Sequence, residues 1–240
     1  MLQESATPTG EIYNTLNTTT MFLDTLLARL APYECLGCSA EGALLCAACR
    51  DDLPHIPSRC YRCHKLSDDN KTCVSCRHTT DLYAVYAVTP YRGVAKELLW
   101  RLKFKGAQAA TAEIAALMLP KLPVEPSMLF VPVPTATSRV RRRGYDQAVL
   151  LARSLAKRTC LPYCAALRRE GQHEQVGSSR AQRLQQLQNA FYSPRPREMR
   201  GAHVVLVDDV VTTGATLEAA ARIAKAAGAA RISAVVFAQA

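Results

Sequence analysis

The stretch VVLVDDVVTTGATL, residues 204–217, combines two adjacent carboxylates with a turn rich in hydroxyls. The apolar run before Asp208 is typical of a buried parallel strand, and the alanine-rich segment after Gly214 is typical of a helix. Ligands gather where such strands end, and backbone N–H groups that enter a helix attract anions. The hydroxyl donors of this turn are Thr212, Thr213 and Thr216. Because carboxylates repel an anion, we expect Asp208 and Asp209 to bind vicinal sugar hydroxyls beside a phosphate pocket.

A second chemical pattern lies in the cysteines, because eight of the ten form four CxxC pairs. The pairs are Cys35/Cys38, Cys46/Cys49, Cys60/Cys63 and Cys73/Cys76. Four thiolates form the tetrahedron that zinc prefers, so eight ligands predict two structural Zn2+ ions. Sharing of one ion by neighbouring pairs is the simplest arrangement, while a crossed pairing and iron–sulfur ligation remain alternatives. Cys160 and Cys164 lie far from these pairs and are expected to be ordinary buried thiols.

The positive charge is concentrated in one segment of the chain. Residues 139–200 hold 14 basic and four acidic residues, which accounts for the whole formal net charge of +10. Such a segment suits a polyanion, either a nucleic acid or a phosphorylated small molecule, although a solvated basic face is the alternative.

The remaining sequence predicts strands that alternate with helices. A strand or hairpin is expected over residues 82–91, and strands are expected over residues 128–134, 163–168, 203–208 and 231–238. Helices are expected over residues 94–104, 108–121, 145–159 and 216–227. This order predicts an α/β fold, with a parallel sheet covered on both faces and preceded by a small four-cysteine-type zinc-binding module. The expected divisions are a disordered tail (1–20), a helix with a double zinc-binding module (21–80) and the sheet domain (81–240).

The sequence contains no pattern typical of a signal peptide or a membrane span. Residues 1–20 contain no basic residue, and the following apolar stretch is short and interrupted by Asp24 and Arg29. We therefore expect a soluble cytoplasmic protein without membrane insertion.

The segment 204–216 resembles the phosphoribosyl-pyrophosphate (PRPP) binding motif of type I phosphoribosyltransferases. In that family, the acids hold the ribose hydroxyls and the loop holds the 5′-phosphate. The resemblance therefore implies that Asp208 and Asp209 bind ribose. It also implies that the 5′-phosphate is held by Thr212, Thr213, Gly214, Ala215 and Thr216. PRPP would be accompanied by Mg2+.

Further motifs resemble one branch, the ComF family. They are the four CxxC pairs, YRGVAKELLWRLKFKG, FVPVPTATSRVRRRGYDQAVLLARSLA, RREGQHEQVGSSRAQRLQ and LVDDVVTTGATL, in this order. The resemblance covers nearly everything from residue 21 onward and implies a phosphoribosyltransferase-like domain after an N-terminal double zinc ribbon. Two positions depart from the family pattern, because Asp146 and Gln186 stand where asparagines are usual.

The same motifs suggest additional ligand contacts. Lys103 and Lys105 could reach a diphosphate, and Arg139 and Arg143 could close over the anion, with Gln147, from a mobile loop. Candidate DNA contacts are Arg141, Arg142, Arg143, Arg180 and Arg183. The aromatic residues near basic side chains, as base stacking requires, are Tyr61, Phe104 and Tyr145.

The family implies a role in natural transformation and in the handling of incoming single-stranded DNA. We expect a PRPP-binding protein whose partners are PRPP or a related phosphoribosyl ligand, single-stranded DNA, and a competence helicase or DNA-uptake machinery. One alternative is a Mg-dependent phosphoribosyltransferase that acts on an unidentified acceptor without touching DNA. Another is a zinc-held adaptor for a DNA-translocation helicase or channel. No catalytic residue is assigned, and no segment after the last strand is expected to read a nucleobase. One hypothesis is therefore that the zinc module covers the site as a lid.

Overall fold

The computed structural model describes residues 33–104, 107–169 and 190–240. The chain divides into two compact units, Met1–Asp51 and Asp52–Ala240, and each is described by itself. The expected tail and the helix near residues 21–30 lie outside the described residues. Within the described part of the chain, no helix is long and apolar enough to cross a membrane.

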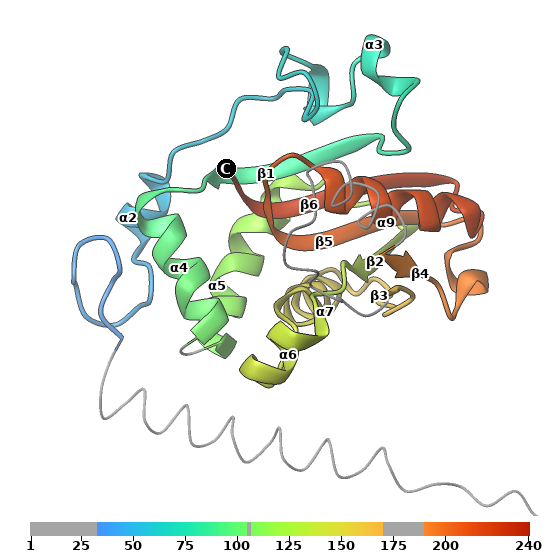
Figure 1. The fold of residues 1–240 in the computed structure, drawn as a ribbon. Coiled ribbons are helices and arrows are strands. Elements are labelled where there is room, and N and C mark those ends of the chain that lie inside the picture. Colours follow the sequence, from blue (N-terminus) through green and yellow to red (C-terminus); the bar gives the residue numbers. More distant parts are fainter. Residues whose placement is uncertain (1–32, 105–106, 170–189) are drawn as a thin grey trace, which may run out of the picture. The chain divides into compact units, whose positions relative to one another are not determined.

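The larger unit is built on a four-stranded parallel sheet with the order β1-β6-β5-β2 (Figure 1). The strands are β1 (Ala84–Pro90), β2 (Met128–Pro132), β5 (His203–Val211) and β6 (Arg231–Gln239). The two central strands are buried along almost their whole length, which explains their nearly continuous apolar sequences. The predicted parallel sheet is therefore confirmed.

Helices cover both faces of this sheet. They are α4 (Gly93–Phe104), α5 (Ala107–Met118), α6 (Thr137–Arg143), α7 (Gln147–Thr159) and α9 (Ala215–Ala226). Leu217 of α9 belongs to one buried cluster with Leu206 and Val236 of the central strands. Since side chains alternate along a strand, Val205 and Val207 point to the opposite face, where α7 packs on β5 and β2.

Short elements complete both units. They are α2 (Ala47–Asp51), η1 (Asp68–Asn70), α3 (Val74–Arg77), η2 (Leu119–Lys121), β3 (Arg168–Arg169), β4 (Phe191–Tyr192) and η3 (Pro196–Met199). The smaller unit contributes α2 and a turn closed by the bridge between Glu34 and Glu41. The second cysteine cluster, made of Cys60, Cys63, Cys73 and Cys76, precedes β1 in the larger unit.

Several predicted elements differ from the structure. The expected strand over 163–168 is reduced to a single parallel bridge from Tyr163 to Phe130, followed by β3 paired antiparallel with β4. Cys160 is exposed, contrary to expectation, because it ends α7 in the left-handed conformation with φ 56°. Cys164 is buried as expected.

Candidate functional site

The two aspartates lie where one neighbour of β5 has ended. Pairing with β2 runs up to Pro132 opposite Val207, whereas pairing with β6 continues to Val211. Asp208 and Asp209 therefore follow the end of β2 and project to opposite sides of β5. The predicted strand end at residue 208 was too early, because β6 supports three more residues.

Asp209 is buried, with 6% of its surface exposed, and forms an ion pair with a lysine. Its Oδ2 lies 2.6 Å from Nζ of Lys103, in the last turn of α4. The lysine predicted to reach a diphosphate thus pairs with a carboxylate of the site. Lys105 lies outside the described residues.

Asp208 is partly covered by the protein and lies near other charged side chains. Its Oδ1 accepts a hydrogen bond from the backbone N–H of Asp209 at 2.8 Å. Burial, followed by the neighbouring Asp209 carboxylate, raises the pKa of Asp208 well above its ordinary value. A hydrogen-bond donor at the Asp208 carboxylate, such as a sugar hydroxyl, would relieve this repulsion.

Arg169 was not predicted from the sequence as a site residue. Burial lowers the pKa of Arg169, and nearby Arg139 lowers it further, whereas Asp208 raises it. Its guanidinium carbon lies over an aromatic ring, 5.5 Å from the ring centroid of Phe191. Arg169 lies in β3, just after the strand expected over residues 163–168. No sequence pattern indicated that it would lie near Arg139 and Asp208.

A cavity of about 200 Å³ opens at the end of β2. Its lining includes Pro132, Pro134, Thr135, Asp146 and Arg169. The wall therefore combines residues that follow β2 with the cationic strand β3, and it contains both hydroxyl and guanidinium donors.

Asp146 occupies a structural position next to this cavity. Its Oδ1 accepts hydrogen bonds from Ala148 N at 3.0 Å and Thr135 Oγ1 at 3.0 Å, and its Oδ2 accepts one from Thr135 N at 2.9 Å. The side chain thus caps the N-terminus of α7 and holds the segment after β2. The carboxylate that stands where an asparagine is usual in the family is therefore hydrogen-bonded at both oxygens.

The loop after β5 presents its polar groups to solvent. Thr212 and Thr213 are exposed, and Gly214 adopts φ +79° before α9 begins. Ala215 N donates to Thr213 Oγ1 at 3.4 Å, and Thr216 stands in the first turn of α9. The N–H groups at the start of that helix and the hydroxyls of the loop can bind a phosphate.

Tyr61 packs against this loop from the second cysteine cluster. A Cβ placed on Gly214 would lie 3.0 Å from Tyr61 Cε2. Tyr61 Oη donates to Glu218 Oε1 at 2.8 Å and lies 2.7 Å from Thr80 Oγ1, while Arg62 forms an ion pair with Glu218. Sequence reasoning named Tyr61 only as a base-stacking candidate and missed Glu218, because no local pattern links residues so far apart.

The arginines of residues 139–143 lie on a helix, not on the expected mobile loop. Their segment forms α6, which ends at Gly144 with φ +83°. Arg143 donates from Nη1 to Gln147 Oε1 at 2.9 Å, and its guanidinium lies 5.4 Å from the ring centroid of Phe104. The segment predicted as a mobile loop is therefore a helix. Arg141 and Arg142 are exposed on α6. Arg180, Arg183 and Gln186 lie outside the described residues.

The eight cysteines form two four-sulfur clusters, and the predicted pairing of neighbouring CxxC motifs is confirmed. The clusters are Cys35, Cys38, Cys46 and Cys49, and Cys60, Cys63, Cys73 and Cys76. In each cluster, all four Sγ atoms lie within 4.8 Å of one another.

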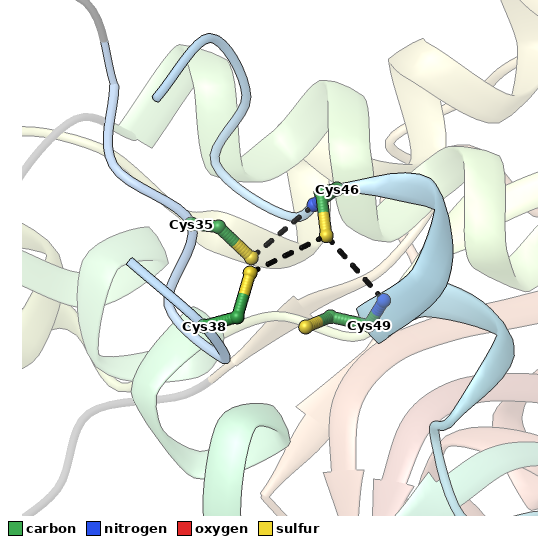
Figure 2. Close-up of side chains that lie close together, drawn as sticks. All are labelled: Cys35, Cys38, Cys46 and Cys49. Atoms are coloured by element: carbon green, nitrogen blue, oxygen red, sulfur yellow. Dashed lines mark hydrogen bonds between the residues drawn. The ribbon is translucent and has the colours of Figure 1, made fainter. Parts of the chain in front are cut away.

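The sulfur spacing fits zinc. Cys38 and Cys46 Sγ are 3.7 Å apart (Figure 2), and Cys63 and Cys73 Sγ are 3.6 Å apart. Four sulfurs bound tetrahedrally at about 2.3 Å from one ion would be separated by about 3.8 Å. Both clusters could therefore hold Zn2+, and the close spacing favours a single ion over a multi-iron cluster.

Backbone N–H groups favour the thiolate form of the first cysteine in each cluster. Backbone hydrogen bonds from Cys46, Cys38 and Gly37 lower the pKa of Cys35 to about 6. Burial raises the pKa of Cys60, but backbone hydrogen bonds outweigh it and bring that pKa to about 6 as well. Cys46 N donates to Cys35 Sγ at 3.3 Å (Figure 2).

Comparisons with known proteins agree with this geometry. The family described as "Phosphoribosyl transferase domain" matches residues 140–240. Competence protein ComFC of Bacillus subtilis is 28% identical over 190 residues, which cover 74% of this chain and 76% of that protein. Competence protein F of Haemophilus influenzae is 37% identical over 101 residues, which cover 41% of this chain and 44% of that protein.

Two further similarities extend the comparison. DNA utilization protein YhgH of Salmonella typhi is 28% identical over 197 residues, which cover 78% of this chain and 81% of that protein. Among solved structures, the glutamine PRPP amidotransferase from B. subtilis complexed with ADP and GMP has a TM-score of 0.40 and 20% identity. That similarity covers 55% of this chain and 26% of the amidotransferase chain.

The parallel sheet, the loop after β5 and the matched domain define an α/β protein of the phosphoribosyltransferase-like class, with cysteine clusters near its N-terminus that can bind zinc. The chain resembles competence proteins of the ComF type, over most of its length in ComFC and YhgH, and its C-terminal part matches the phosphoribosyl transferase domain.

Proposed function

We propose that the protein binds PRPP or a related phosphoribosyl ligand and acts in competence, in the handling of incoming single-stranded DNA. The observation that supports the ligand is the placement of Asp208 and Asp209 beside the loop 212–216. The competence relatives and the phosphoribosyl transferase domain support the process. The proposed location is the cytoplasm, where incoming DNA is processed.

In this proposal, the ligand spans the end of β5. The carboxylates accept hydrogen bonds from the ribose hydroxyls, and the 5′-phosphate binds the N–H and hydroxyl groups of residues 212–216. The diphosphate lies toward the cavity after β2, where Arg168 and Arg169 line the wall, and it brings Mg2+. Lys103 pairs with Asp209, and in this proposal its ammonium exchanges that carboxylate for the diphosphate when the ligand binds.

Calorimetry with PRPP and Mg2+ tests this proposal on zinc-loaded protein. The wild type should bind, and Asp208→Asn together with Asp209→Asn should abolish binding while zinc content stays at two per chain. Asp69→Asn is the matched control, because it removes an exposed carboxylate that neither lines the cavity nor belongs to the proposed ribose contacts. Binding that survives the double substitution would contradict the proposed role of the aspartates.

Turnover on the same sample distinguishes a sensor from an enzyme. An active phosphoribosyltransferase releases pyrophosphate from C1′ as an acceptor attaches, and the protein contributes orientation and charge stabilisation. Pyrophosphate release in the presence of a panel of bases would establish transfer. Binding without release would support a PRPP-responsive protein.

A direct contact with single-stranded DNA is supported by an exposed aromatic and basic surface on α4 and α6. The rings of Trp100 and Phe104 lie 5.9 Å apart and are 41% and 50% exposed. Arg143 lies over Phe104, and Arg141 and Arg142 belong to the same helix as Arg143. Stacking platforms beside cations are the usual means of binding unpaired bases.

A salt titration with fluorescent oligothymidine tests this surface. Replacement of Arg141 and Arg142 by alanine should weaken binding and flatten the dependence of log affinity on log salt, because fewer counterions are released. Phe104→Ala should weaken binding without changing that slope, whereas Tyr192→Ala, a similarly exposed aromatic on β4, is the control. An unchanged slope in the arginine variant would exclude these contacts.

A further inference from the structure

Residues 212–216, which bind the 5′-phosphate in the proposed function, are called the phosphate loop. The second cysteine cluster reaches this loop and the first turn of α9 through the two residues between Cys60 and Cys63. Tyr61 and Arg62 stand between Cys60 and Cys63. The turn is closed by hydrogen bonds from His64 N to Cys60 O at 2.8 Å and from Cys60 N to Lys65 O at 2.9 Å. Coordination of both cysteines to one ion would therefore fix the direction in which Tyr61 and Arg62 project.

The Tyr61 ring occupies the space beside Gly214. It is 8% exposed and belongs to the buried cluster that includes Leu217 of α9. Because Gly214 has φ +79° and a Cβ there would meet the ring at 3.0 Å, this contact needs glycine for two separate reasons. The ring thus limits the positions that the loop backbone can adopt.

Glu218 connects the same turn to the first turn of α9. Its carboxylate accepts from Tyr61 Oη at 2.8 Å and pairs with Arg62, while its backbone N–H donates to Gly214 O at 2.9 Å. A free carboxylate near this helix start would repel a bound phosphate. Tyr61 and Arg62 hold the carboxylate and offset its charge.

We propose that the second cysteine cluster, when it holds its metal, positions the phosphate loop through Tyr61, Arg62 and Glu218, so that metal binding there strengthens binding of the ligand's 5′-phosphate. The inference rests on the proposed function for the identity of the ligand. Tyr61 is then a positioning residue, and the cluster contributes to the site as well as to folding. In this proposal, the half of the zinc module that supports the loop 212–216 is the one that contains Tyr61.

Hydrogen exchange and PRPP calorimetry on the full zinc-loaded chain test the coupling. In Tyr61→Ala, the amides of residues 212–218 should exchange about tenfold faster and the Kd for PRPP should rise about tenfold, as expected for loss of a hydrogen bond to a charged group. Exchange of β1 should not change. Tyr61→Phe keeps the ring and should give an intermediate result.

A pair of cysteine substitutions separates the two clusters. Cys63→Ser and Cys38→Ser should each lower zinc content to one per chain, but faster exchange of residues 212–218 is expected for Cys63→Ser alone. Unchanged loop exchange in Tyr61→Ala, or equal effects of the two cysteine variants, would overturn the proposal. If Cys63→Ser does not fold, Tyr61→Phe and Glu218→Gln still test the proposal. Both remove a contact of Glu218 and should speed exchange of residues 212–218, and unchanged exchange in both would overturn the proposal. Absence of PRPP binding in the wild type would contradict the proposed function, while loop exchange would still report on the coupling.

Discussion

The two cysteine clusters have the same four ligands and similar sulfur spacing, but they belong to different compact units. Leu36 and Gly37 separate the first pair of ligands in one cluster, and Tyr61 and Arg62 separate them in the other. Tyr61 and Arg62 reach a helix of the sheet unit, with Glu218 as their shared partner. The comparison shows that the ligands fold the turn, whereas the residues between them determine what the turn supports.

The largest expected difference follows from removal of one ligand in each cluster. Cys60→Ser should lower the stability of the sheet unit by about 4 kcal/mol or more, because loss of a structural metal also releases a buried tyrosine. Cys35→Ser should remove one zinc and leave the main calorimetric transition in place. Scanning calorimetry with zinc analysis measures both, and equal losses would show that the clusters are equivalent.

Glycines with positive φ provide the next comparison. Gly214→Ala should cost about 2 kcal/mol, because the left-handed conformation itself is unfavourable for alanine and the new Cβ would meet Tyr61. Gly144, in the same unit, has φ +83°, and nothing lies within 4 Å of the place where an added Cβ would stand, so Gly144→Ala carries the backbone cost alone. Urea unfolding of both variants isolates the contribution of the tyrosine contact, and equal costs would mean that the contact contributes nothing.

Asp208→Asn should change the ligand site without changing either cysteine cluster. Burial and Asp209 raise the folded-state pKa of Asp208, so the folded protein retains a proton that the unfolded chain releases. Stability therefore falls as pH rises from the ordinary aspartate value to the raised pKa. The substitution should remove this slope and raise the melting temperature at neutral pH by a few degrees, while PRPP binding is lost and two zinc ions remain. A lower melting temperature at neutral pH would contradict this assignment.

Arg62→Ala should have the smallest effect on stability. The arginine side chain is 40% exposed, and exposed ion pairs contribute about 1 kcal/mol or less. The loss should shrink further in high salt, because the pair is screened. Thermal unfolding at two salt concentrations measures this loss of stability. A large loss that does not depend on salt would indicate that Arg62 contributes through packing and not through its ion pair with Glu218.

Local patterns were sufficient to predict the sheet, its main helices and the sulfur clusters. Apolar runs identified β5 and β6, and CxxC spacing identified all eight ligands, because a CxxC turn is itself a local structure. The pairing of neighbouring motifs followed from their proximity in the chain. These features need no knowledge of distant residues.

The parts that could not be predicted depend on contacts between distant segments. Glu218 is 157 residues from Tyr61, and Lys103 meets Asp209 only after α4 packs beside the end of β5. Arg139 and Arg143 were expected on a loop from their place in a family motif, but arginine favours helices and the segment between Ala136 and Gly144 forms α6. Asp146 likewise shows its capping role only in three dimensions.

The strand order also has a consequence for synthesis of the protein. β1 pairs along its length with β6, so residues 84–90 have no partner strand in the four-stranded sheet until residues 231–239 have left the ribosome. The second cysteine cluster, in contrast, lies within residues 60–76 and can bind its ion much earlier. During translation, the metal-bound turn would therefore remain with Tyr61 uncovered, and the chain would be most prone to aggregation in that interval.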